Sequence, residues 1–438
     1  MNMEPRRLRI FFLFCALVLP VQLCEIPRMN SDLIGCLNRR LMSVTEDLSK
    51  ELNPSVYMAL RLSSDHNLKK EAQYFHRLKN AFQAKEKSFL PAGQQVQPKT
   101  GHLALYLLAL RAACQDMKTR EMKRLVTRLK HDLHKEKEQI GPEEKGHPIT
   151  NYYQYSLGVL ALCVHGKKID THVIQKLINA EMHNKFTHGT KLSVDTEAMA
   201  GLAFHCLKQS RLYTRSIVSA LLQAVQSVKK KILQAQTPEG TFGNIFSSPL
   251  AMQVLVATGM SNKKSECSRG MNALLGTLEH NHDNLMMMSQ LLPVLHGKSY
   301  LDIATMGCQA ERDTLQQHVK CPESSVTALE HSIFTIQLSV QHPSSHEELY
   351  NHSIQVPSGS SLLDVLGKAQ NQGSKLFTFE TRSTLQGPML TTVMGIEAKD
   401  AERSYWQLLK APDTSLEKGV SDYRPQDGES IILKLSHQ

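Results

Sequence analysis

The sequence predicts an N-terminal (α/α)6 barrel joined by a linker to a small, β-rich C-terminal α+β domain. Two observations lead to this prediction. Between Pro54 and about Leu295, near-continuous apolar segments alternate with longer amphipathic ones, and the theme recurs at intervals of roughly 40 to 55 residues. After about Cys321, the pattern changes to short stretches in which apolar and polar residues alternate. We therefore expect helices in the first part and mainly strands in the second.

Six segments are apolar on every side, which is typical of fully buried helices. They are PSVYMALRL from Pro54, HLALYLLALRAAC from His102, YYQYSLGVLALCV from Tyr152, DTEAMAGLAFHCL from Asp195, SPLAMQVLVATG from Ser248 and NLMMMSQLLPVL from Asn284. The segments between them carry one apolar stripe, such as Leu125, Leu129 and Leu133, which indicates half-exposed helices. An inner ring of six helices inside an outer ring of six follows. The alternative is an α-solenoid, whose terminal repeats need a polar outer face.

The starts of the apolar helices agree with the barrel. Asn53-Pro54 and Ser248-Pro249 each place a capping side chain before a proline at the first helical position. The inner helices of such a barrel all start at the same end. We therefore expect the residues that precede them to cluster at one rim.

The C-terminal part is expected to contain four strands and one helix. The strands are SIFTIQLSV from Ser332, HSIQVP from His352, KLFTFET from Lys375 and SIILKLS from Ser430. SLLDVLGKAQ from Ser361 fits a helix, whereas DAERSYWQLLK from Asp400 fits a helix or a strand. The expected boundaries are 24–308 for the barrel, 309–325 for a polar linker and 326–438 for the C-terminal domain.

The first residues predict secretion. Arg6, Arg7 and Arg9 precede an apolar run from Ile10 to Leu19, which is typical of a signal peptide over residues 1–23. The run is shorter than the about 20 residues that a membrane span needs, and no later uncharged stretch of that length is continuously apolar. We therefore expect an extracellular chain without a membrane span.

The cysteines indicate disulfides. Cys15 lies in the signal region, and eight cysteines follow it, an even number that favours paired cysteines in a secreted chain. The chain has no C-x-x-C pair and no H-x-x-x-H next to a cysteine, so we expect no zinc site. Asn351-His352-Ser353 is a glycosylation sequon, and the chain is therefore a candidate glycoprotein.

The charge balance is basic, with 51 Lys and Arg against 41 Asp and Glu, a formal charge of +10. The signal region contributes three Arg and one Glu, so about +8 remains after it. This balance suits an acidic partner, although dispersed, solvated lysines are the alternative. Nucleic acid is not expected, because aromatic residues are only 6 % of the chain and no compact basic stripe is interleaved with them.

Seven blocks of the chain resemble the transcobalamin family of cobalamin carriers, with intrinsic factor and haptocorrin as more distant relatives. They are GHLALYLLALRA, NYYQYSLGVLALC, SVDTEAMAGLAF, QTPEGTFGNIFSSPLA, SQLLPVL, YWQLLK and DYRPQDGE, and the likeness runs from Cys24 to the C-terminus. The resemblance implies cobalamin as cargo between the barrel and the small domain, and uptake through a cell-surface receptor. We expect a monomeric carrier and no catalysis.

The resemblance also implies which residues contact the ligand. Corrin is a large apolar plate fringed with amides, so neutral donors and acceptors around its edge suit it better than charges. From the barrel, the implied contacts are His102, Thr150, Asn151, Tyr152, Tyr153, Gln154, Lys191, Leu192, Ser193, Val194, Asp195, Asn244, Ser247 and Gln290. From the small domain, they are Trp406, Gln407 and Leu408.

Several of these residues also fit plain structural roles. Trp406, the only tryptophan, suits a flat cover over a planar ligand or the core of the small domain. Tyr152 and Tyr153 fit the rim or ordinary helix packing. Ser193 and Asp195 fit ligand contact or helix capping.

Two positions depart from the family pattern. His102 stands where the family has a glutamine, and an imidazole can still donate or accept one hydrogen bond. Lys191, two residues before the serine of SVDT, stands where transcobalamins place a histidine that binds cobalt. A protonated lysine has no lone pair to donate, so we expect water or the original axial group on the metal. The alternative is that His188, three residues upstream, reaches the cobalt.

The resemblance implies disulfides Cys24–Cys267, Cys114–Cys308 and Cys163–Cys206. Each would tie helices of the barrel together, and long closed loops of this kind stabilise by several kcal/mol in the chain-entropy model. Cys36 and Cys321 are left over. They fit a fourth bridge, free thiols or an intermolecular bond.

Other classes of protein lack their residues here. Enzymes such as terpenoid cyclases and glycosidases also use (α/α)6 barrels, but the D-x-D-D string of a protonating cyclase is absent. A glycosidase needs two carboxylates facing one bond, whereas Asp195 and Glu197 lie two apart on one helix and point in different directions. A complement-like thioester protein needs G-C-G-E-Q, which is also absent. An interaction module without a ligand stays open.

Overall fold

The computed structural model describes most of the chain after the predicted signal peptide. The described residues are 31–48, 52–88, 100–141, 146–188, 191–259, 264–279, 284–307, 312–315, 333–342, 348–371, 377–384, 387–399, 404–416 and 418–437. The predicted signal peptide, Cys24, Cys308 and Cys321 lie outside these residues. Within the described residues, no helix is long and apolar enough to cross a membrane.

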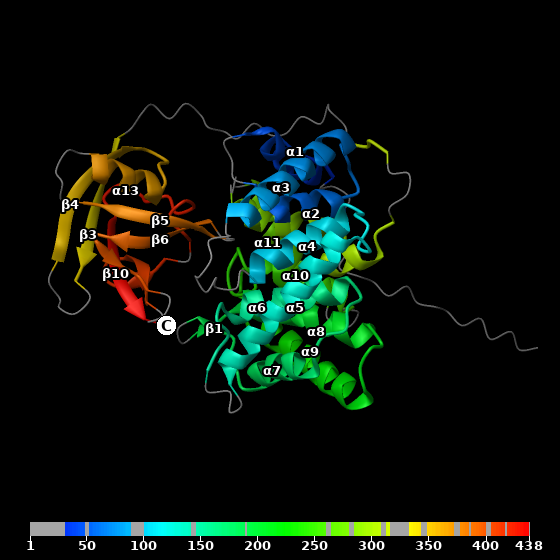
Figure 1. Ribbon diagram of the computed structural model, residues 1–438. Helices are drawn as coiled ribbons and strands as arrows, with labels where there is room; N and C mark the ends of the chain where they lie inside the picture. Colours follow the sequence, from blue (N-terminus) through cyan, green and yellow to red (C-terminus); the bar gives the residue numbers. More distant parts are fainter. Residues whose placement is uncertain are drawn as a thin grey trace, which may run out of the picture.

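Twelve described α-helices form the N-terminal domain and alternate between two rings (Figure 1). The inner ring consists of α2 (Pro54–Leu62), α4 (Thr100–Ala112), α6 (Tyr152–Val164), α8 (Val194–Gln209), α10 (Ser248–Ala257) and α12 (Leu285–Leu295). The outer ring consists of α1 (Ser31–Glu46), α3 (Leu68–Ser88), α5 (Arg120–Ile140), α7 (Thr171–Met182), α9 (Arg215–Gln234) and α11 (Lys264–Glu279). Each inner helix packs on the next and α12 packs on α2, so the ring closes. This closure confirms the barrel and excludes a solenoid, which has two free ends.

Burial and capping explain why these segments form helices in this order. Nearly every side chain of α4 and α6 is buried, whereas α5 buries the stripe that includes Leu125, Leu129 and Leu133. Side-chain caps start the inner helices at α2 (Asn53), α6 (Asn151), α8 (Ser193) and α12 (Asn284). The capped ends lie together and form one rim of the barrel.

The C-terminal domain contains two sheets and one helix. The larger sheet has the order β4-β3-β10-β8-β9, formed by β3 (Ile333–Gln341), β4 (Glu348–Pro357), β8 (Ser404–Lys410), β9 (Thr414–Ser415) and β10 (Ser430–His437). β10 runs parallel to β3 and antiparallel to β8. The smaller sheet is formed by β5 (Phe379–Thr384), β6 (Gly387–Val393) and β7 (Ile396–Glu397), and the helix is α13 (Leu362–Asn371). The segment that fitted a helix or a strand is thus the strand β8.

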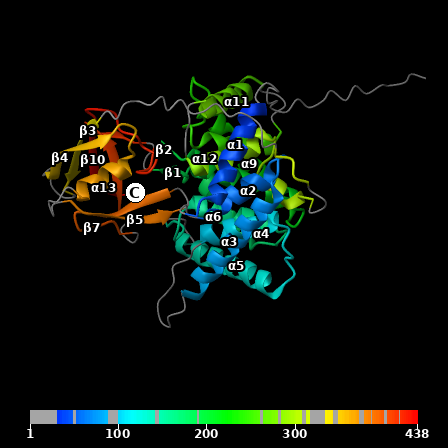
Figure 2. The same cartoon turned by 90° about the horizontal axis from the view of Figure 1, so that it is seen from above.

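A short hairpin projects from the barrel toward the small domain. It consists of β1 (Thr187–His188) and β2 (Lys191–Leu192), and it lies between the two domains in both views (Figures 1 and 2). On the chain between the domains, residues 312–315 bond to the loop after α2, where the His66 carbonyl accepts from the amides of Thr314 and Leu315. The predicted linker is therefore pinned to the barrel at this point.

Disulfides brace the barrel. Cys163 on α6 bonds to Cys206 on α8, as the resemblance implied. Cys36, Cys114 and Cys267 are also disulfide-bonded, and their partners lie outside the described residues. Cys36 is therefore not a free thiol. The pairings Cys24–Cys267 and Cys114–Cys308 stay predictions.

Candidate functional site

Among the described residues, contacts at three places join the small domain to the barrel, and each involves a residue that precedes an inner helix. The rings of His188 and Tyr405 lie 5.9 Å apart between their centroids, and the Lys418 ammonium lies 5.7 Å from the Phe246 ring. The Asn284 amide donates a 3.0 Å hydrogen bond to the Asp422 carboxylate. These contacts place the small domain beside the rim from α8 to α12. The space between the rim and this domain is the candidate binding site.

Under this part of the rim, three inner helices bring polar side chains together. Tyr153 from α6 lies beside Gln290 from α12, and the carboxyl of Asp195 from α8 lies near the tyrosine. Burial, followed by the proximity of Tyr300 and Asp195, raises the pKa of Tyr153 well above its usual value, so its hydroxyl stays neutral. Tyr300, on the 3-10 helix η2 (Tyr300–Thr305), is buried beneath this group. The result is a layer of neutral hydroxyl and amide groups with a single carboxyl beside it.

Asp195 is the carboxyl of this layer, and its environment is unusual. The residue is half-buried in the first turn of α8, and burial raises its pKa to about 6. The described residues offer its carboxyl no hydrogen bond. A carboxylate in such a place is suited to accept N–H groups from a bound molecule.

The rim at α4 and α6 is held by a buried glutamate from the outer helix α5. Glu136 is 0 % exposed, and its carboxyl accepts hydrogen bonds from the hydroxyls of Thr100 and Thr150, both 2.7 Å, and from the Thr150 amide at 2.9 Å. Gln154 adds a bond, because its Oε1 accepts from the amide of Gly101 at 3.3 Å. Thr150 and Gln154 thus join the first turns of two neighbouring helices.

The two remaining rim residues of this sector have simpler surroundings. Asn151 is exposed and caps α6, where its Oδ1 accepts from the Gln154 amide. His102 is exposed in the first turn of α4. Both side chains are accessible at the rim.

The loop before α10 is shaped by its own side chains. The Asn244 Oδ1 accepts from the amides of Phe246 and Ser247, and the Ser247 hydroxyl donates to the Phe242 carbonyl at 2.6 Å. Gly243 has φ +72°, and a Cβ there would lie 2.8 Å from Val194, so this loop packs directly on the start of α8. Ser247 is only 2 % exposed. The hydroxyl of Ser247 therefore holds the loop, and a contact between Ser247 and the ligand stays a prediction.

The hairpin brings His188 and Lys191 face to face. The two residues are direct partners in the antiparallel pair, and all four strand residues are exposed. Ser193 then caps α8 through its hydroxyl, and Val194 is buried behind it. His188 therefore stands on the same face of the hairpin as the position where the family pattern has a cobalt ligand.

Trp406 lies in the core of the small domain, which is one of the two roles that the sequence left open for it. It is 5 % exposed within the apolar core of the small domain, and its indole N–H donates to the Ile396 carbonyl at 3.2 Å. Successive side chains of a strand point to opposite faces, so Tyr405 and Gln407 lie on the face opposite to Trp406 and Leu408. Leu408 packs against the same core. Tyr405, which reaches the hairpin, is the contact that the sequence analysis missed.

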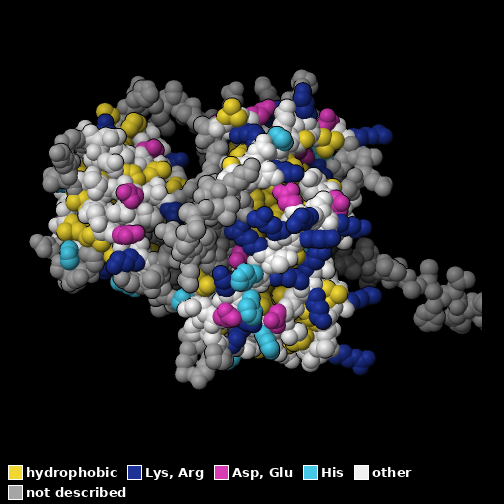
Figure 3. All heavy atoms as spheres, in the orientation of Figure 1, with side chains coloured by type: hydrophobic (Ala, Val, Ile, Leu, Met, Phe, Trp, Pro, Cys, Tyr) yellow, Lys and Arg dark blue, Asp and Glu magenta, His cyan; other side chains and the backbone are white. Residues whose placement is uncertain are grey.

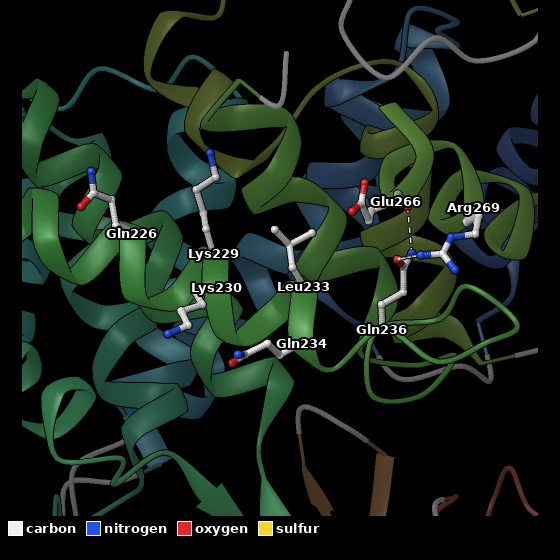
Figure 4. A pocket seen from close by; sticks show the side chains of 8 residues that line it. All are labelled: Gln226, Lys229, Lys230, Leu233, Gln234, Gln236, Glu266 and Arg269. Carbon is white, nitrogen blue, oxygen red and sulfur yellow. Dashed lines mark hydrogen bonds between the residues drawn. The ribbon is translucent and has the colours of Figure 1, made fainter. Parts of the chain in front are cut away.

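A surface cavity of about 580 Å³ lies on the outside of the barrel, at the outer helices α9 and α11 (Figure 4). It is lined by Gln226, Lys229, Lys230, Leu233, Gln234, Gln236, Glu266 and Arg269. In Figure 4 the side chains of α9 are spread along the helix, whereas Gln236 accepts a 3.0 Å hydrogen bond from Arg269 and donates a 2.8 Å hydrogen bond to the Glu266 carbonyl. Tyr153, Asp195 and Gln290 do not line this cavity, so it is separate from the candidate site.

Comparisons with known proteins agree across the whole chain. A family profile described as "Eukaryotic cobalamin-binding protein" matches residues 6–328, and one described as a domain of unknown function matches residues 359–437. Transcobalamin-2 of Bos taurus is 43 % identical over 436 residues, which cover 97 % of this chain and 98 % of that protein. Transcobalamin-2 of Rattus norvegicus is 44 % identical over 420 residues, with coverage of 94 % and 95 %. A crystal structure of haptocorrin in complex with Cbi aligns with a TM-score of 0.75 at 25 % identity, covering 95 % of this chain and all of that one.

Proposed function

The chain belongs to the eukaryotic cobalamin-binding protein family and is a transport protein of the transcobalamin type, and we propose that it holds the corrinoid between the barrel rim and the small domain. Cobalamin is cargo, and the chain is a carrier and not an enzyme. The proposal concerns where the cargo lies, which residues contact it and how the loaded protein reaches cells.

One observation carries the placement of the ligand. Tyr153, Asp195 and Gln290 come from three different inner helices and meet under the rim sector that the small domain approaches. These are the neutral donors and acceptors, with one carboxylate, that the amide fringe of corrin needs. Asn151 and His102 extend this polar edge along the rim, and Gln407 and Tyr405 face it from the small domain.

The test of the function is colour. We expect the purified protein, incubated with hydroxocobalamin and desalted, to retain a red chromophore at close to one equivalent. Bovine serum albumin treated in the same way provides the control for unspecific retention. A colourless protein would contradict the proposal and favour an interaction module.

The upper ligand of cobalt is proposed to be water or the group that the cobalamin brings with it. Lys191 offers no lone pair, and His188 already contacts Tyr405. We expect Lys191→His to produce a histidine-ligated visible spectrum and His188→Ala to leave the wild-type spectrum unchanged. If the His188→Ala variant changes the spectrum of bound hydroxocobalamin, His188 is the ligand instead.

Secretion and receptor uptake complete the proposal. Figure 3 shows Lys and Arg side chains gathered on the barrel around α5, and the exposed ones on this helix are Arg120, Lys123, Arg124, Lys130 and Lys135. Such a surface suits an acidic receptor module. We expect binding of the loaded protein to receptor-bearing cells to fall as salt rises, and Lys123→Glu/Lys130→Glu to weaken it more than Lys434→Glu in the small domain. Binding that does not depend on salt would refute this part.

A further inference from the structure

A half-buried lysine joins both ends of the segment that carries the hairpin. Lys231 on α9 places its Nζ 2.8 Å from Glu181 Oε2, 2.9 Å from the Glu181 carbonyl oxygen and 3.0 Å from Glu197 Oε1. Glu181 lies in the last turn of α7, and Glu197 lies in the first turn of α8. The segment 182–196, which carries the hairpin, therefore has both of its ends bound to the ammonium of Lys231.

The hairpin itself has little else to hold it. Its four strand residues are exposed, and its ladder consists of two residue pairs. At its base, the Ser193 amide donates to the Phe186 carbonyl at 2.9 Å, and the buried Phe186 ring lies against Tyr152. The position of the two paired strands therefore depends on how their outer ends are held.

The burial of Glu181 and Glu197 beside a single lysine indicates that one of the two carboxyls carries a proton. Both carboxyls are 0 % exposed, and Glu181 Oε1 and Glu197 Oε2 are buried without a hydrogen-bond donor among the described residues. Burial, followed by the neighbouring Glu181 carboxyl, raises the pKa of Glu197. A proton on Glu197 supplies the missing donor and leaves one negative charge opposite one lysine.

We propose that Lys231 and Glu197 are positioning residues for the bound corrinoid: they staple residues 182–196 so that the hairpin meets the small domain at the ligand. His188 at the hairpin contacts Tyr405, so a shift of the staple moves a contact between the domains. Ser193 and Asp195 follow the hairpin directly, so the same shift moves the carboxyl that faces the site. The inference rests on the proposed binding site, but the staple itself exists without ligand.

The test uses two substitutions at one position in the full-length protein. Glu197→Ala removes the contact to Lys231 while Lys231 keeps Glu181, so no buried charge is left alone. Glu197→Gln is the matched control, because its amide oxygen still accepts from Lys231 and its size is kept. In the ligand-free protein, we expect hydrogen exchange of the amides at 187–193 to be faster by about tenfold or more in Glu197→Ala, and within about twofold of wild type in Glu197→Gln.

With hydroxocobalamin bound, we expect its dissociation rate to rise by about tenfold in Glu197→Ala and to be restored in Glu197→Gln. Lys231→Met should exceed both effects, and Lys230→Met, at the exposed neighbour, should have none. Unchanged hairpin exchange in Glu197→Ala would overturn the staple, and faster exchange with unchanged dissociation would overturn its role in binding. If wild-type protein does not bind hydroxocobalamin at all, the proposed function fails, whereas the exchange experiment still tests the staple.

Discussion

The rim of the barrel is held in two different ways in its two sectors. At α4 and α6, one glutamate from an outer helix accepts three hydrogen bonds from two threonines, and no lysine or arginine takes part in these bonds. From α8 to α12, residues that precede the helices also contact the small domain. The hairpin before α8 is held by the ion pairs of Lys231 with Glu181 and Glu197. The first sector is a rigid wall, and the second is where the two domains can respond to each other.

This difference explains how one sector of the rim can be formed before the ligand binds while the other sector closes around the ligand. A wall whose polar groups are satisfied within the barrel keeps its shape whether or not ligand is present, which reduces the ordering required on binding. The contacts of the second sector are few and polar, so they can open to admit a large ligand. Substitutions in the first sector should therefore change stability, and those in the second should change binding kinetics.

The largest effect is expected from Glu136→Ala. It leaves the hydroxyls of Thr100 and Thr150 and the Thr150 amide without their acceptor at a buried site, and we expect a loss of about 3 kcal/mol in the free energy of unfolding of the barrel. Urea unfolding followed by far-UV circular dichroism measures it. Glu138→Ala, an exposed glutamate on the same helix, is the control and should change little. Equal stabilities for the two variants would refute the description of this sector as a wall held by Glu136.

The second effect is a pH dependence of the free energy of unfolding, caused by the ion pairs of Lys231 with Glu181 and Glu197. Burial and the Glu181 carboxyl raise the pKa of Glu197 to about 9, above its ordinary value of 4.5, so the folded protein holds a proton that the unfolded chain has lost. The contribution is present at low pH and is lost as pH rises through this range, by about 1.4 kcal/mol for each pH unit. Glu197→Gln should remove this decline. Urea unfolding at pH 6, 7 and 8 compares the slopes, and parallel slopes would show that no proton is shared.

Much of the architecture could be predicted from the sequence because it depends on periodicity. Helices buried on every side must lie inside, so the apolar runs such as the one from Tyr152 placed the inner ring directly. The strand β8 could not be assigned from the sequence, because a short apolar run such as YWQLLK fits either period. Its alternation decides that Tyr405 faces the barrel and Trp406 the core, so the sequence alone left both roles of Trp406 open.

The site was predicted in part. Tyr153, Asp195 and Gln290 do meet, but Thr150 and Ser247 bond within the rim, because each lies beside a buried group that needs a donor. Lys231 and Glu136 gave no signal in the sequence, since a charged residue on an amphipathic helix is usually solvated. Asn284 was visible as a helix start, but its second bond, to Asp422, depends on how two domains meet, which local sequence patterns do not contain.

A smaller effect is expected at the contact between Asn284 and Asp422. Asp422→Ala removes one hydrogen bond across the domains, worth about 1 kcal/mol, and leaves the capping bond of Asn284 to Met287 in place. We expect hydroxocobalamin to dissociate about fivefold faster, with little change in the stability of either domain. Asp413→Ala, an exposed aspartate of the small domain, is the control. If the dissociation rate stays at the wild-type value, the hydrogen bond between Asn284 and Asp422 contributes nothing to the retention of hydroxocobalamin.

A last effect concerns the carboxyl of the second sector and its response to acid. Burial raises the pKa of Asp195 to about 6, so this group gains a proton as pH falls through that value and can no longer accept hydrogen bonds as an anion. We expect wild-type affinity for hydroxocobalamin to fall several-fold, and by no more than about tenfold, between pH 7 and pH 5, and Asp195→Asn to bind slightly more weakly at pH 7 and to show no such change. His188 lies on the hairpin that precedes Asp195, so His188→Ala is the control and should keep the wild-type slope. If His188→Ala removes the slope and Asp195→Asn keeps it, the hairpin imidazole senses the acid and the carboxyl does not.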